Sequence, residues 1–155
     1  MKKLFILVSL ACLFLVSGCG EKKKEVLCTL ESNNIVSDYK LSATYKATIV
    51  DDHVTKVKTT EKVESKDQSI LDSLKTTIED SYKKMNEAYG GYQYKSSQEG
   101  DLLTVTTNID YTILDMDKFI KDNSVMKGYV NKKNQITIEG IQKLYESMGA
   151  TCEVK

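Results

Sequence analysis

Alternating apolar and polar positions predict a series of β-strands along the chain. Every second side chain from Tyr39 to Ile49 is apolar, and the positions between them are Lys, Ser or Thr. A period of two residues is typical of an antiparallel strand with one buried face and one solvated face. Less regular patterns predict further strands at 25–32, 53–64, 92–97 and 102–113, and a closing strand at 150–154.

Turn residues predict that four of these strands form two hairpins. Asp51-Asp52 suits a tight turn between strands 39–50 and 53–64, and the polar segment 98–101 suits a turn in the second hairpin.

The strand at 53–64 has an irregular pattern. Val54 is out of step with Val57 and Val63, which predicts a β-bulge or a twisted edge strand. Its lysines discourage edge-to-edge aggregation, because unpaired edges attract other chains (Lys56, Lys58, Lys62).

Apolar residues at three- and four-residue spacing predict helices in the rest of the chain. The strongest spans 67–89, with Asp67 as N-cap and Gly90-Gly91 as its end. A short helix at 115–122 packs Phe119 against the core. A last helix begins after Thr137 and ends at Gly149, with a buried stripe of five side chains (Ile138, Ile141, Leu144, Tyr145, Met148).

These elements predict an α+β fold. Two hairpins and the terminal strands build an antiparallel sheet, and the long central helix and the shorter C-terminal helix cover one of its faces.

The first eighteen residues have the pattern of a bacterial lipoprotein signal peptide. Lys2 and Lys3 precede an apolar run of about 13 residues, which is too short to span a bilayer comfortably. The run ends in Ser17-Gly18-Cys19, a lipobox in which the cysteine receives the lipid. We therefore expect Cys19 to be acylated, with palmitate among its chains; a transmembrane anchor or a secreted protein is the alternative.

This leader sets the expected organisation of the chain. Residues 1–18 are the signal peptide, 19–25 a lipidated tether, and 26–155 a single α+β domain. The lysines of the tether (Lys22, Lys23, Lys24) either attract anionic lipid headgroups or belong to a solvated linker whose glutamates offset them; we favour the linker. The expected location is the extracytoplasmic face of the cell membrane.

Two of the four cysteines remain for the fold. Cys12 lies in the leader and Cys19 is the lipid acceptor, which leaves Cys28 and Cys152 near the two ends of the mature chain. Two thiols in an exported protein predict a disulfide.

Charge argues against a nucleic-acid partner. The chain has 22 basic and 22 acidic residues, and all of the basic residues are lysine. Without arginine it lacks the planar guanidinium group that donates two parallel hydrogen bonds to a phosphate or a carboxylate. Removal of the leader leaves 20 lysines and 22 acidic residues, a net charge of −2.

Few residues suggest catalysis. His53, the only histidine, follows Asp51-Asp52, and this cluster suits either a metal ligand set or, more commonly, a charged hairpin tip. Without a second histidine no other Ser-His or Cys-His pair can form. The aspartates at 115, 117 and 122 lack the spacing of a calcium loop. We therefore expect no enzyme activity, no metal and no cofactor.

The nine tyrosines are the residues best suited to recognition. Tyr89, Tyr92 and Tyr94 flank Gly90-Gly91 and are candidate contacts for a ligand or partner, because tyrosine combines an apolar ring with a polar tip. The alternative is that they fill the core and its rim in a chain without tryptophan.

The pattern of the whole chain resembles the YehR-like family of uncharacterised bacterial lipoproteins. The end of the chain carries the likeness, through Ile136-Thr137-Ile138, Gln142-Lys143-Leu144, Met148-Gly149-Ala150 and Glu153-Val154-Lys155. The resemblance implies an α+β domain with an antiparallel sheet, displayed at the membrane, with no established activity. It supplies no ligand residues, and the Cys28 and Cys152 pair is not part of it.

Three functions follow as expectations. The first is a non-enzymatic envelope lipoprotein that acts as an interaction or binding module for another envelope protein. The second is a carrier of a small lipid, sugar or peptide, which needs a pocket of about 300 Å³ or more. A carboxylate-dependent enzyme is the weakest of the three.

Overall fold

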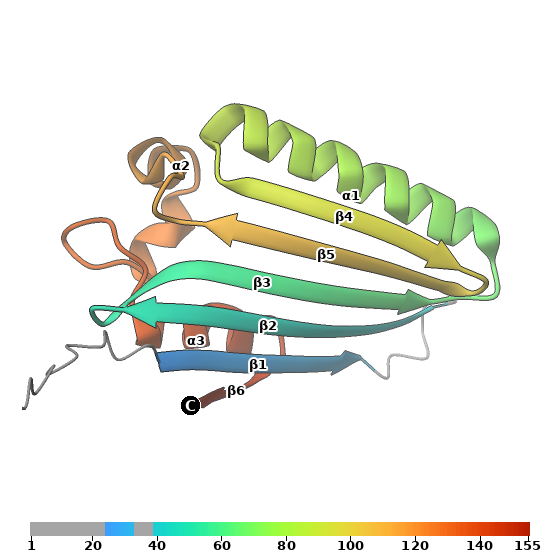
Figure 1. The fold of residues 1–155 in the computed structure, drawn as a ribbon, viewed down its shortest axis with the longest axis horizontal. Coiled ribbons are helices and arrows are strands. Elements are labelled where there is room, and N and C mark those ends of the chain that lie inside the picture. The colour runs from blue at the N-terminus through green and yellow to red at the C-terminus, as the bar shows by residue number, and fades with distance from the viewer. Residues whose placement is uncertain (1–23, 33–38) are drawn as a thin grey trace, which may run out of the picture.

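The structure, a computed structural model, describes residues 24–32 and 39–155 as a six-stranded antiparallel sheet with helices on one side (Figure 1). The strands are β1 (Lys24–Ser32), β2 (Lys40–Val50), β3 (His53–Glu64), β4 (Tyr92–Glu99), β5 (Leu102–Asp110) and β6 (Thr151–Val154). The helices are α1 (Gln68–Tyr89), α2 (Met116–Asp122), α3 (Ile138–Ser147) and the 3-10 helix η1 (Ser124–Gly128). The predicted α+β class is therefore confirmed.

The strand order is β4-β5-β3-β2-β1-β6. Helix α1 connects β3 to β4, which are parallel to each other but not adjacent. Strand β5 lies between them and pairs antiparallel with both. Of the two alternatives predicted for 53–64, a bulge or a twisted edge strand, the edge strand is wrong, because β3 pairs on both sides, with β2 and with β5. Its lysines lie on a face of the sheet and not at its edge.

The predicted bulge and turn are both present in the β2–β3 hairpin. The register shifts between Thr48 and Ile49, which leaves Thr55 as the extra residue of β3. Asp51 and Asp52 form the turn with φ of 49° and 61°, a conformation that short polar side chains tolerate and that matches the twist of a two-residue hairpin.

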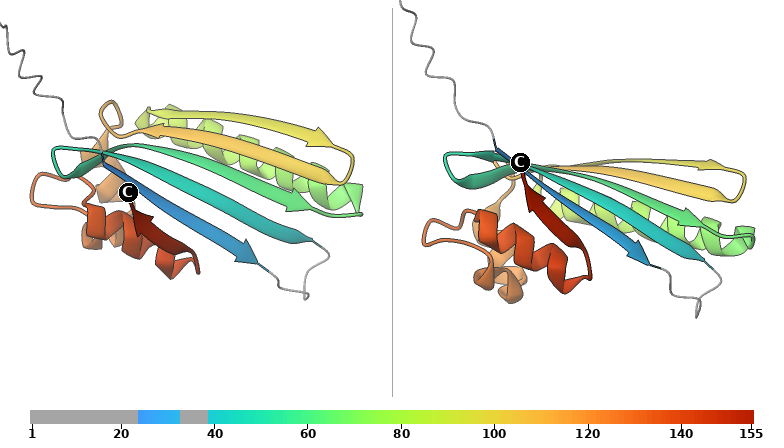
Figure 2. Two further views of the ribbon diagram at one scale, coloured as in Figure 1. Left: turned by 60° about the horizontal axis from the view of Figure 1, so that its bottom comes forward. Right: turned by 90° about the horizontal axis from the view of Figure 1, so that it is seen from below.

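The two faces of the sheet differ completely. All the helices lie on one face, as the edge-on view shows (Figure 2). On this covered face the strands place apolar residues that are nearly all buried (Val26, Ala47, Ile49, Val57, Val63, Leu103, Val105). The side chains between them point to the other face, which no described helix covers. We call this second surface the uncovered face.

Side-chain caps fix the two longer helices at the predicted positions. The Asp67 carboxylate accepts a hydrogen bond from the Ser69 backbone N–H at the start of α1, and Gly90 ends that helix with φ of 69°. The Thr137 hydroxyl accepts from the Gly140 N–H at the start of α3. Each cap satisfies a backbone donor that the first helical turn leaves without a partner.

Two stretches differ from the prediction. The strand expected to run to residue 113 ends at Asp110, whose carboxylate accepts hydrogen bonds from the N–H and hydroxyl of Thr112 and starts a turn. Ile113 is consequently 69% exposed and not part of a buried face. Met148 is 55% exposed, because α3 ends at Ser147 and the chain turns into β6.

The predicted disulfide joins β1 to β6. Cys28 and Cys152 are direct partners in the register of these strands, and their sulfurs are bonded. The bond ties the first described strand to the last one and closes a loop with a sequence separation of 124 residues.

Candidate functional site

A hollow on the uncovered face is the best-defined candidate site. It has a volume of about 600 Å³, and its lining includes three lysines from the central strands, Lys46 of β2 with Lys56 and Lys58 of β3. Asn108 of β5 and Gln93 of β4 add amide groups to the lining. We call this site the lysine hollow.

The register of β2 and β3 places two of these cations opposite each other. Lys46 and Lys58 are direct cross-strand partners, an arrangement that costs stability when the charges are alike. The Lys46 ammonium lies 2.9 Å from the Glu25 carboxylate, which offsets its charge. In the described part of the chain Lys58 has no such carboxylate partner, so its ammonium is available to an anionic group of a ligand or partner.

Lys56 is held at the other end of the hollow. Its ammonium lies 2.9 Å from the Asp110 carboxylate of β5. A hydrogen bond from Lys56, and to a smaller extent one from Thr112, holds the pKa of the Asp110 carboxyl below its ordinary value. The hollow therefore contains two compensated lysines and one free lysine, with amide and hydroxyl groups around them.

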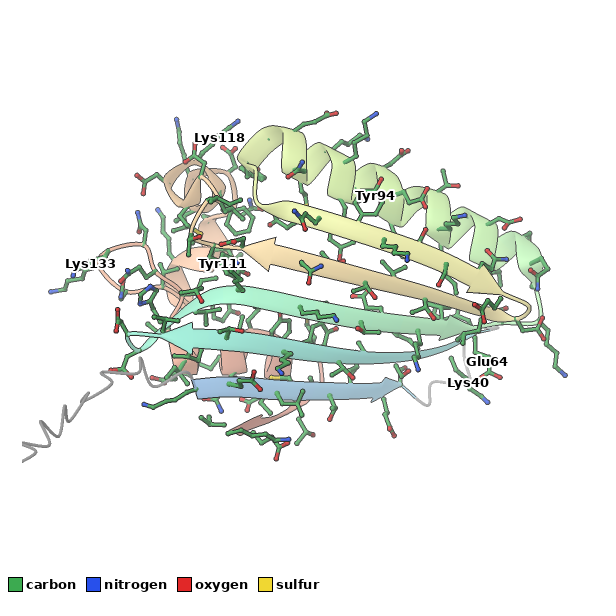
Figure 3. All side chains as sticks on the ribbon, in the orientation of Figure 1. Lys40, Glu64, Tyr94, Tyr111, Lys118 and Lys133 are labelled. Atoms are coloured by element: carbon green, nitrogen blue, oxygen red, sulfur yellow. A yellow bond between two sulfur atoms is a disulfide. The ribbon has the colours of Figure 1, made fainter. Side chains whose placement is uncertain are left out.

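The three tyrosines predicted as contacts do not form one site. Tyr89 packs edge-on against Phe119 at 5.2 Å between ring centres, and its hydroxyl donates to Asp122. Tyr92 is buried under α1 and contributes to the lining of the lysine hollow. Tyr94 stacks on Tyr82 of α1 at 5.9 Å and remains 38% exposed (Figure 3).

A different group of tyrosines surrounds a carboxylate on the covered face. Glu61 of β3 occupies a position between the buried residues Thr59 and Val63, and its cross-strand partners Ala43 and Val105 are also buried. It interacts electrostatically with tyrosines of β2, α1 and α3 (Tyr45, Tyr82, Tyr145). We call these four residues the Glu61 cluster.

Burial sets the protonation behaviour of this cluster. It raises the pKa of the Glu61 carboxyl, because a low-polarity environment disfavours the charged form. It raises the pKa of the Tyr45 hydroxyl to about 12 and also raises that of Tyr145. Tyr45 and Tyr145 stack at 4.1 Å between ring centres, which fixes α3 against β2.

The sequence did carry a signal for Glu61 that the interpretation of strand 53–64 missed. Glu61 is an even number of residues from both Val57 and Val63, so it shares their face in any regular strand. A charged residue in an otherwise apolar series is informative, because charged side chains are rarely buried without a partner. The alternation of strand 39–50 places Tyr45 on a buried face, but a single sequence does not show which helix residues pack on it.

The Asp51-Asp52-His53 cluster is a hairpin tip. The His53 Nδ1 atom lies 3.1 Å from the Asp51 carbonyl, and Asp52 forms an ion pair with Lys24 at 3.3 Å. Within residues 24–32 and 39–155, no three histidine, cysteine, aspartate or glutamate side chains converge as a metal site would require.

The predicted lipidation site and leader lie outside the described residues. Nothing in the structure therefore bears on Cys19 or on residues 1–18. Among the helices that the structure does describe, none has the length and apolar character needed to cross a bilayer.

Comparison with known proteins supports the fold alone. No protein-family model and no curated protein sequence matches the chain. The solved structure of the E. coli YehR protein is similar over 86% of this chain and 92% of that chain, with 15% identity and a TM-score of 0.54. A structure of a Streptococcus pneumoniae protein covers 99% of this chain and 98% of that one, with 14% identity and a TM-score of 0.49. The expected likeness to YehR is thus supported as a likeness of fold.

The Glu61 cluster generates a prediction about pH and stability. Because the folded protein holds the Glu61 proton more tightly than the unfolded chain does, stability falls as the pH rises from the ordinary carboxyl value of 4.5 through the raised value. The substitution Glu61→Gln should remove this fall. Urea unfolding measured from acidic to neutral pH should show a steeper loss of stability for the wild type than for this variant.

The control for that prediction is Glu99→Gln, which changes an exposed carboxylate at the end of β4. It should leave the pH profile as it is in the wild type. Parallel profiles for the wild type and Glu61→Gln would show that the Glu61 carboxyl is not desolvated.

Proposed function

We propose that this protein is a membrane-anchored, extracytoplasmic bacterial lipoprotein that acts as a non-enzymatic binding module through its uncovered face. The acyl group on Cys19 holds the domain at the membrane, and the lysine hollow contacts an envelope protein or another partner with anionic and hydrogen-bonding groups.

The anchor part of the proposal is supported by sequence and by redox chemistry. The leader at 1–18 ends in a lipobox, and the domain contains a disulfide between Cys28 and Cys152. Disulfides persist in oxidising compartments outside the cytoplasm and are rare in the reducing cytosol. The disulfide agrees with export, and the lipobox agrees with export followed by retention at the outer surface of the membrane.

The binding part rests on one observation, the hollow of about 600 Å³ whose lysines lie on the uncovered face; Asn86 of α1 also contributes to its lining. The only histidine of the chain, which a His-based catalytic site would need, is at the β2–β3 turn. Recognition without chemistry is the simplest use of such a surface.

A small-ligand carrier is the second candidate, because the hollow has the volume expected of a ligand site. Carrier pockets are predominantly apolar and enclose their ligand. The lysines and amides of this hollow instead suit contact with a polar partner surface, which favours the interaction module.

The anchor is tested by substituting the lipid acceptor. Cys19→Ala should abolish acyl labelling and move the protein from the membrane fraction to the soluble fraction after detergent-free lysis, because the lipid is the proposed attachment. Cys28→Ala with Cys152→Ala serves as the control and should leave acyl labelling intact. Unchanged labelling of Cys19→Ala would contradict the proposal.

The binding surface is tested by site-specific photo-crosslinking in intact cells. A photoreactive residue in place of Asn108, which is exposed in the lysine hollow, should give a discrete adduct. The same residue in place of Asp80, on the exposed side of α1, is the control and should give none. Lys58→Glu should suppress the Asn108 adduct by reversing the free charge, and adducts from Asp80 alone would contradict the assignment.

A further inference from the structure

One end of the sheet lies close to the start of the described chain. Lys24, the first residue of β1, forms an ion pair with Asp52 in the β2–β3 turn. An antiparallel bridge between His53 and Thr137 brings the segment before α3 to the same turn. Figure 1 shows α2 and the loops that follow it at the same end of the sheet as the β2–β3 turn, with α2 near the end of α1 and the beginning of β1 on the other side of that turn.

Chain length limits how far this end can lie from a lipid on Cys19. Lys24 lies five residue steps after Cys19, with four residues between them. A fully extended chain advances about 3.3–3.6 Å per residue, so the start of β1 lies within about 17 Å of the acylated residue. This step rests on the proposed function, since it takes Cys19 as the anchor, and it turns the α2 end of the domain toward the bilayer.

The segment at this end has the opposite charge from the rest of the protein. Residues 111–137 contain five lysines and three aspartates, a net charge of +2, whereas the mature chain has a net charge of −2. At the other end of the sheet Gln68 donates a hydrogen bond to Asp101, and Glu64 lies beside Lys40 (Figure 3). The segment 111–137 therefore carries a local excess of positive charge.

The lysines of this segment line a second hollow. It has a volume of about 530 Å³ and is lined by Lys121, Lys127 and Lys132, with Asn131 contributing a polar side chain. Among the described residues none of these three lysines has a carboxylate within ion-pair distance. The one aspartate of the lining, Asp117, accepts a hydrogen bond of 2.6 Å from Asn134 instead.

An exposed apolar residue lies between two of these lysines in the sequence. Val125 of η1 is 74% exposed and lies in the chain between Lys121 and Lys127. Lysine ammonium groups suit lipid phosphates, and a neighbouring apolar side chain suits the boundary between headgroups and acyl chains. Lys133 extends from the same end of the molecule (Figure 3).

We propose that the surface formed by Lys121, Lys127 and Lys132, together with the exposed Val125 of η1, docks on the membrane and binds the phosphates of anionic lipid headgroups. The lipid on Cys19 already retains the protein, so this second contact orients it. With the α2 end on the bilayer, the strands extend away from the membrane.

The docking surface is tested on the mature chain carrying Cys19→Ser, so that no acyl chain contributes to binding. This protein should sediment with vesicles of phosphatidylcholine mixed with phosphatidylglycerol, not with phosphatidylcholine alone, and salt should weaken the binding. The triple variant Lys121→Gln, Lys127→Gln, Lys132→Gln should bind about 100-fold more weakly, because each lysine near an anionic surface contributes about fivefold.

The matched control removes three exposed lysines elsewhere, by Lys62→Gln, Lys83→Gln and Lys95→Gln. It should bind the vesicles as the unmodified sequence does, and both triple variants should unfold at the same temperature as that sequence. Equal weakening by the two triple variants would overturn the proposal, since it would reveal attraction by overall charge. Binding of inorganic phosphate without binding of anionic vesicles would also overturn it.

The lipidated chain gives a readout in its own setting. When it is reconstituted in the same two kinds of vesicle, amide hydrogen exchange at 121–133 should slow on the anionic lipid only. Exchange that is equal on both lipids would overturn the docking surface while leaving the anchor intact. The acyl-labelling experiment detects any failure of acylation at Cys19 independently of these binding measurements. The two proposals therefore fail in distinguishable ways.

Discussion

Burial of only one face of the six-stranded sheet is the constraint on which the rest of the structure depends. The strands alternate apolar and polar side chains, so packing one face against α1 and α3 sends every second residue to the uncovered face. The apolar face forms two adjacent clusters of buried side chains, one beneath the N-terminal half of α1 and a larger one that α3 and α2 cover. The opposite face is left to water or to a partner.

This constraint explains both the lysine hollow and the Glu61 cluster. On the uncovered face a lysine costs little, because its charge stays solvated, and two of them can stand opposite each other with a nearby carboxylate as compensation. On the covered face a carboxylate is expensive, and Glu61 keeps its place between tyrosines with a raised pKa for the carboxyl group. A charged side chain therefore has different consequences on the two faces.

Much of the fold could be predicted from periodicity and capping residues, and the candidate site could not. Alternation located the strands and Asp67 and Thr137 located the starts of two helices, because these signals are local. The opposition of Lys46 and Lys58 depends on the bulge at Thr55, since a regular two-residue hairpin would place Lys46 opposite Val57. The inner position of β3 depends on the α1 crossover and on pairing with β5, which is a long-range choice. The exposure of Ile113 follows from the turn that Asp110 begins, and the interpretation of the pattern extended the strand past it.

The most direct measurement compares two adjacent leucines of β5 on opposite faces. Leu103 is fully buried on the covered face, whereas Leu102 is partly exposed on the other. Urea unfolding should show that Leu103→Ala lowers the free energy of unfolding by about 3 kcal/mol and that Leu102→Ala lowers it by less than about 1 kcal/mol. Equal losses, or a larger loss from Leu102→Ala, would contradict one-sided burial of the sheet and with it the account of the uncovered face.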